Sequence, residues 1–85
     1  MTFTGAKIKE QSITFALAVV NPHVLTSSTI ETTRASFIPI FGNVPIILVG
    51  KNANGSLKYN GRTDIVRFLS KINPTRIPWK QYTVN

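Results

Sequence analysis

The chain has 85 residues, enough for one small domain that buries only a modest hydrophobic core. It contains no cysteine, which excludes disulfide bonds and thiol–disulfide exchange. Ten Lys and Arg residues against three Asp and Glu residues give a formal net charge of +7. A positive field of this size favours polyanions or acidic protein surfaces as partners.

The positive charge is concentrated in the second part of the chain. Residues 51–85 contain Asp64 as their only acidic residue. Their basic residues are Lys51, Lys58, Arg62, Arg67, Lys71, Arg76 and Lys80. Residues 10–33 contain two acidic residues and no Lys or Arg. This asymmetry predicts a basic face that meets either nucleic acid or acidic protein.

The first strands are expected before residue 21. Residues 1–10 alternate weakly between polar and apolar and predict an N-terminal arm or an edge strand. Residues 13–20, ITFALAVV, are typical of a strand buried on both faces. This run is far shorter than the roughly 20 residues that a membrane-spanning helix needs, so no membrane span is expected. Asn21 and Pro22 end the strand, since proline cannot donate to a sheet ladder.

A short helix is predicted within residues 24–38. Ser28 and Glu31 have the spacing of a capping box, in which each side chain bonds to the backbone of the other residue. Ile30, Arg34, Phe37, Ile38 and Phe41 follow helical spacing. Pro39 is expected to end the helix at about Ile38, because the residue before a proline avoids helical backbone angles.

A strand and a hairpin follow the helix. Pro45 begins a second apolar run that extends to Gly50. Asn54 followed by Gly55 is the strongest short hairpin signal in the chain. Residues 56–60 are therefore predicted to form the return strand.

Residues 63–72 predict an amphipathic helix. Thr63 is expected at the N-cap, with Asp64 in the first turn near the positive end of the helix dipole. One apolar stripe consists of Ile65, Phe68, Leu69 and Ile72.

Residues 74–85 contain two prolines and are expected to form an irregular, extended C-terminal tail. The candidate partner-binding residues in this tail are Arg76, Ile77, Trp79, Lys80 and Tyr82. One interpretation is nucleic-acid binding, in which the cations meet phosphates and the aromatic rings stack on bases. The other is a clasp, in which the apolar side chains insert into grooves of a neighbouring protein.

In the second half of the chain, Val44 and Pro45 form a VP motif before an apolar strand, a Gly-containing hairpin follows, and residues 59–63, YNGRT, lead into the last helix. This order of motifs resembles the closing half of the thioredoxin fold. Roughly residues 37–72 are similar to protein disulfide isomerase domains and to small glutaredoxin-like proteins of large DNA viruses. The resemblance implies a truncated thioredoxin-like α/β fold, with a small three- to four-stranded mixed sheet and two helices in a body at residues 11–73. It also implies a cis peptide before Pro45.

The same resemblance implies a degenerate active site. A thioredoxin-like chain places Cys-x-x-Cys after its first core strand, where this chain has NPHV at residues 21–24. The degenerate positions would be Asn21, Pro22, His23, Val24, Val44 and Pro45. Alternatively, residues 13–20 match the third strand of that fold, and the site is lost altogether.

The side-chain inventory points away from catalysis. His23 is the only histidine, and no G-x-S-x-G motif accompanies it. No Gly-rich phosphate loop is present, and three dispersed acidic residues predict no acid–base pair. We therefore expect no enzyme, no metal or organic cofactor and no small-molecule substrate.

The expected function is that of a structural or adaptor subunit which binds other protein subunits of a larger assembly. Frequent Asn, Ile, Lys and Thr, together with the viral resemblance, favour a minor structural (capsid) protein of a large DNA virus. Without a signal-peptide pattern, we expect it inside a cell or within a virion. The alternative is a basic nucleic-acid-binding module, such as a ribosomal-type RNA-binding protein. A third hypothesis is a degenerate enzyme with a ligand pocket between residues 21–23 and 44–45.

Overall fold

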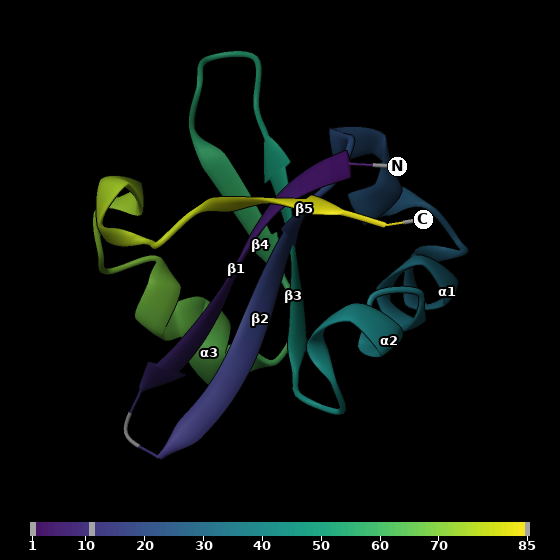
Figure 1. The fold of residues 1–85 in the computed structure, drawn as a ribbon. Coiled ribbons are helices and arrows are strands. Elements are labelled where there is room, and N and C mark those ends of the chain that lie inside the picture. Colours follow the sequence, from purple (N-terminus) through teal and green to yellow (C-terminus); the bar gives the residue numbers. More distant parts are fainter. Residues whose placement is uncertain (1, 11, 85) are drawn as a thin grey trace.

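The computed structural model describes residues 2–10 and 12–84, in which five strands form one mixed sheet. The strands are β1 (Thr2–Glu10), β2 (Ile13–Val19), β3 (Ile46–Lys51), β4 (Leu57–Asn60) and β5 (Lys80–Thr83). Their order across the sheet is β4-β3-β2-β1-β5 (Figure 1). Strands β2 and β3 are parallel, and the other neighbours are antiparallel. The α/β class and the mixed sheet are thus confirmed, with five strands instead of three or four.

Helical segments cover both faces of the sheet (Figure 1). They are η1 (Pro22–Thr26), α1 (Ile30–Ala35), α2 (Ile38–Phe41), α3 (Thr63–Leu69) and η2 (Pro74–Arg76), where η marks a 3₁₀ helix. Helix α3 lies on one face, and η1, α1 and α2 lie on the other. Among the residues described, no helix is long and apolar enough to cross a membrane.

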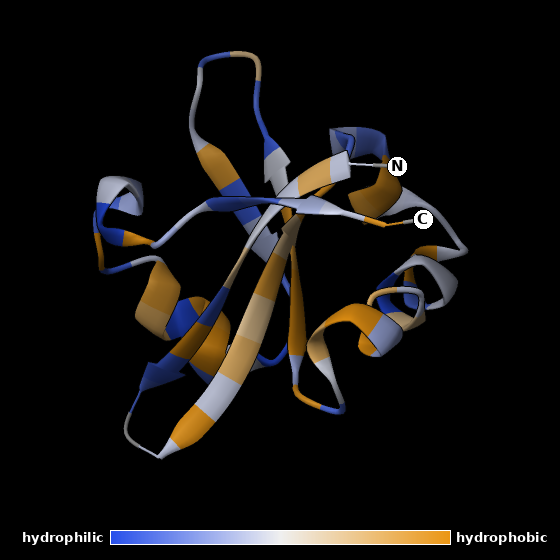
Figure 2. Cartoon of the chain, viewed as in Figure 1, coloured by the Kyte–Doolittle hydropathy of each residue, from blue (hydrophilic) through white to orange (hydrophobic). Residues whose placement is uncertain are grey.

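Two hydrophobic cores result from the alternation of side chains along the central strands. The core under α3 contains Ala6, Phe15, Leu17, Ile47, Val49, Ile65, Leu69 and Ile77. The core under α1 and α2 contains Phe3, Ala16, Ala18, Phe37, Phe41, Ile46 and Leu48. Strands β2 and β3 supply side chains to both cores, and apart from Thr14 and Lys51 they contain no polar side chain (Figure 2). This confirms the expectation of strands buried on both faces.

The two ends of the chain pair with each other. Strand β1 is part of the sheet and not a free arm, and β5 covers its outer side over residues 2–5, where Thr2 pairs with Thr83 and Gly5 pairs with Lys80. The expectation of an irregular tail was therefore wrong. Both prolines of the tail lie before residue 80, so the backbone N–H groups of β5 remain free to pair with β1.

Prolines 39 and 45 also differ from expectation. Pro39 lies in the first turn of α2. Backbone N–H groups in the first turn have no partner within the helix, so a proline without an N–H is tolerated there, and Pro39 begins a helix instead of ending one. No cis peptide bond occurs among the residues described, so the peptide between Val44 and Pro45 is trans.

The helix caps differ from expectation too. Thr29, and not Ser28, is the N-cap residue of α1, and its side chain makes no capping hydrogen bond. Helix α3 has Arg62 at its N-cap and ends at Leu69, and Asp64 lies in its first turn as expected. At the C-cap, the Ser70 hydroxyl donates to the carbonyl oxygens of Val66 and Arg67 (3.0 Å each).

Candidate functional site

The degenerate active-site positions lie at opposite ends of the parallel strand pair. The Ala16 N–H donates to the Pro45 carbonyl (2.9 Å), which places Pro45 where β3 begins. Residues 21–24 follow the far end of β2, and Pro22 packs against Gly50. Five residues of β3 separate Gly50 from Pro45, or about 16 Å. The hypothesis of a ligand pocket between the two segments was therefore wrong.

His23 is exposed and is held by its own loop. The Asn21 Oδ1 atom accepts a hydrogen bond from the His23 backbone N–H (3.3 Å) and lies 2.7 Å from His23 Nδ1. The Ser27 hydroxyl lies 2.9 Å from the Thr29 hydroxyl, so these two groups pair with each other. Within the described ranges, no group of three or more His, Cys, Asp or Glu residues could hold a metal ion.

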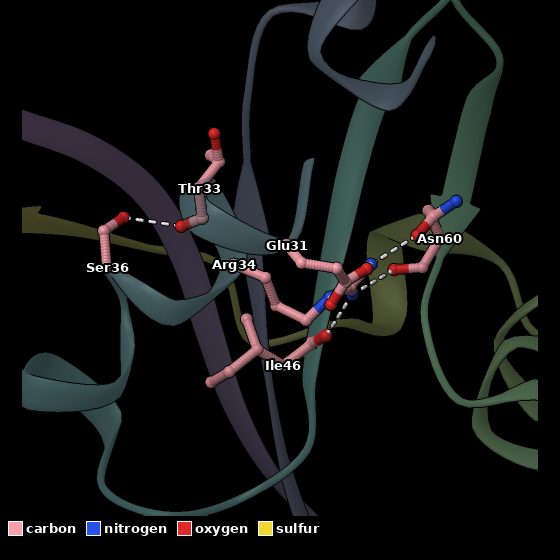
Figure 3. Close-up of polar contacts among 6 residues, drawn as sticks. All are labelled: Glu31, Thr33, Arg34, Ser36, Ile46 and Asn60. Atoms are coloured by element: carbon pink, nitrogen blue, oxygen red, sulfur yellow. Dashed lines mark hydrogen bonds and ion pairs between the residues drawn. The ribbon is translucent and has the colours of Figure 1, made fainter. Parts of the chain in front are cut away.

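Arg34 reaches from α1 across the ends of β3 and β4 (Figure 3). Its Nη1 donates to the carbonyl oxygens of Ile46 (2.7 Å) and Asn60 (2.9 Å), and its Nη2 donates to Asn60 Oδ1. Its Nε forms an ion pair with Glu31 (2.9 Å). The Arg34 side chain is only 16% exposed, and each guanidinium nitrogen has a protein partner. We therefore assign Arg34 a structural role.

A surface pocket of about 350 Å³ surrounds this arginine. Its lining residues are Glu31, Arg34, Pro45, Ile46, Asn60, Gly61 and Arg62. Arg62 forms an ion pair with Asp64 (2.9 Å), so both arginines are already matched by carboxylates. The sequence held one signal for this position: Arg34 has helical spacing with the apolar residues Ile30 and Phe37, which predicts the same helix face for all three.

The five partner-binding candidates of the tail do not form one surface. Ile77 is 4% exposed within the core under α3, so it cannot insert into a partner without leaving that core. Tyr82 packs on the opposite face, where its ring stacks on Phe3 at 5.2 Å between centroids. Lys80 Nζ lies 5.3 Å from the centroid of the Tyr82 ring. Arg76 is exposed in η2.

Trp79 lines an open groove between the β3–β4 hairpin and the tail, which we name the Trp79 groove. It has a volume of about 730 Å³. Its lining residues are Thr4, Val19, Lys51, Gly55, Ser56, Leu57, Pro74 and Trp79. These residues are widely separated in the sequence, so the sequence alone could not show that they line one groove.

The acidic residues all lie where the parallel strands β2 and β3 begin. Glu10 pairs with Ile13, the first residue of β2. Asp64 lines a pocket of about 150 Å³ together with Glu10 and Ile13. Glu31 lines the Arg34 pocket beside Pro45, which precedes β3. The acidic groups therefore gather at one end of the sheet.

Four cations lie toward the other end of the sheet, which we name the basic end: Lys51, Lys58, Arg76 and Lys80. Lys51 is the last residue of β3, and Lys58 pairs with Gly50 beside it. Arg76 is in η2, whose first residue, Pro74, lines the Trp79 groove together with Lys51. Lys80 pairs with Gly5, which in turn pairs with Ala18 near the end of β2. The seven residues of β2 span about 20 Å. Since charges are screened over about 8 Å at physiological salt, the distant carboxylates neutralise this end only weakly.

Tyr59 is a polar group buried without a partner. Its hydroxyl makes no hydrogen bond among the described residues, and burial raises the pKa of the Tyr59 phenol above its ordinary value. Its ring packs against the core under α3. We therefore assign Tyr59 to packing.

Comparisons with known proteins find no relative of this chain. No protein-family model, no curated protein and no solved structure matches this chain.

Proposed function

We propose that this protein is a non-catalytic binding module that attaches to nucleic acid through its basic end. The observation that carries the proposal is that four cations lie toward one end of the sheet, away from all three carboxylates, which lie at the other end, where Arg34 and Arg62 pair with two of them. Nucleic-acid backbones bind such surfaces because each contacted phosphate releases condensed counterions.

The absence of catalysis is part of the proposal. A catalytic histidine requires a nucleophile and an orienting group within hydrogen-bond reach. The described contacts of the His23 ring are with Asn21, and the Ser27 hydroxyl pairs with Thr29. These contacts support a structural role for His23 and Ser27 in the segment between β2 and α1.

A second candidate function is that of a structural or adaptor subunit, such as a minor capsid protein in a virion. The observation that favours it is the position of β4 and β5 at the two edges of the sheet. An edge strand offers unpaired backbone groups to a strand of a neighbouring protein. A thioredoxin-like ancestry is compatible with either role and stays a proposal.

Salt dependence distinguishes the two functions. With four cations at phosphates, the logarithm of the association constant for a single-stranded DNA 20-mer should fall with the logarithm of salt concentration at a slope of about −3. Fluorescence anisotropy of a labelled 20-mer measures this slope. A module that uses its sheet edges should show weak DNA binding at low salt and no such slope, which would refute the proposal.

A matched pair of variants locates the binding surface in the same assay. Replacing Lys51 and Lys58 with glutamate should weaken binding at least about tenfold. Replacing Lys9 and Arg67 with glutamate removes the same charge from β1 and α3 and should have a much smaller effect. Equal losses would show that the affinity reports net charge alone.

A further inference from the structure

We infer that the Trp79 groove holds unpaired bases of a single-stranded nucleic acid, while Lys51 in the same groove holds a phosphate of that strand. This inference rests on the proposed function and adds to it a preference for single strands. Its three supports are a fixed aromatic ring, a groove of suitable size and lining, and a cation beside the apolar surface.

The Trp79 ring is held in place before any ligand binds. Its Nε1–H donates to the Pro74 carbonyl (3.0 Å), and its backbone N–H donates to the Ile77 carbonyl (2.8 Å). Ile77 is itself buried under α3, so it anchors the segment that carries the tryptophan. A preorganised ring loses little conformational freedom on binding, which favours stacking with a base.

The groove has the dimensions and the lining that a nucleotide requires. Its volume of about 730 Å³ falls within the roughly 300–1,000 Å³ typical of small-molecule sites. Val19 and Leu57 supply apolar surface, and the hydroxyl-bearing Thr4 and Ser56 also line it. A base can contact the apolar surface and the ring of Trp79.

Charge complementarity favours nucleic acid as the occupant. Lys51 lines the same groove as Trp79, and no acidic residue lines it. A phosphate attached to a bound base therefore meets a cation within one groove. A duplex offers the same phosphates, but its bases are stacked on both faces and cannot reach the ring. The arrangement thus favours unpaired strands.

Intrinsic fluorescence provides a direct test because Trp79 is the only tryptophan in the chain. The unmodified protein is titrated with a 15-nucleotide oligothymidylate and with an abasic strand of equal length, which keeps the phosphates and lacks the bases. We expect the oligothymidylate to quench the emission and to bind about 5- to 150-fold more tightly than the abasic strand. The abasic strand should leave the emission unchanged.

Substitutions of Trp79 test the same point with a labelled oligothymidylate. Trp79→Ala should reduce its affinity to that of the abasic strand, and Trp79→Phe, which keeps a flat ring, should retain most of it. Circular dichroism of both variants separates loss of the ring from loss of the fold. The titration of the unmodified protein decides the question if Trp79→Ala does not fold.

The possible failures are distinguishable. Equal affinity for both strands with unchanged emission would overturn the groove inference and leave the proposed function standing. No binding of either strand at low salt would overturn both. Quenching by polyglutamate with higher affinity than by oligothymidylate would also overturn both, because it would identify an acidic polypeptide as the occupant.

Discussion

Replacing Gly5 with alanine is expected to lower the free energy of unfolding by about 3 kcal/mol or more, at the upper limit for overpacked sites. Gly5 is buried in β1 between β2 and β5. A Cβ atom there would lie 2.6 Å from the Leu17 carbonyl oxygen and 3.0 Å from Cε2 of Phe3. The oxygen belongs to the backbone of a central strand, so it cannot move without disturbing the β1–β2 ladder.

This loss is large for a domain whose total stability is expected to be about 5–15 kcal/mol. The melting temperature should fall by about 12–24 °C, since each kcal/mol corresponds to about 4–8 °C in a domain of this size. Urea denaturation followed by circular dichroism measures the change. The control is Thr2→Ala, an exposed position on the same strand, which should change stability by less than about 0.5 kcal/mol. A loss below 1 kcal/mol for Gly5→Ala would contradict the close approach of the two strands.

Replacing Arg34 with alanine is expected to cost about 3 kcal/mol, because hydrogen bonds to charged groups are worth about 1.5–3 kcal/mol. The substitution removes the donors to the Ile46 and Asn60 carbonyls, where α1 docks on the sheet. Arg34→Lys should recover only part of this loss, since an ammonium group cannot reach several acceptors in the fork geometry of a guanidinium.

The matched control for Arg34 is Glu31→Gln. The Glu31 side chain is 76% exposed, and exposed ion pairs contribute about 0–1 kcal/mol. The same urea experiment should therefore show a small effect for Glu31→Gln and a large one for Arg34→Ala. Similar effects for both substitutions would mean that the arginine acts only through its ion pair.

Elements with local sequence signals were predicted correctly. Strands β2 and β3 follow from two apolar runs, the β3–β4 turn from Asn54 and Gly55, and α3 from the helical spacing of its apolar residues. The pairing of β5 with β1 could not be predicted in this way, since Thr4 and Gln81 are 77 residues apart. Its partner, and not its own sequence, makes residues 80–83 a strand.

The candidate site was predictable only in part. Sequence counting revealed the excess of cations after residue 50, and folding then placed the carboxylates together where β2 and β3 begin. The partition of the tail aromatics was not predictable: Trp79 packs against the core under α3, and Tyr82 packs against the core on the other face. This partition depends on where the tail crosses the sheet, which a single sequence does not reveal.

The central claim is that nucleic acid contacts the basic end, and an NMR titration tests it most directly. Amide chemical shifts of the ¹⁵N-labelled protein would be recorded while a single-stranded DNA 15-mer is added at low salt. We expect the shifts to concentrate at residues 51–58 and 76–80, with little change around Glu10, Glu31 and Asp64. Changes confined to the end that carries Glu10, Glu31 and Asp64 would contradict the proposed function.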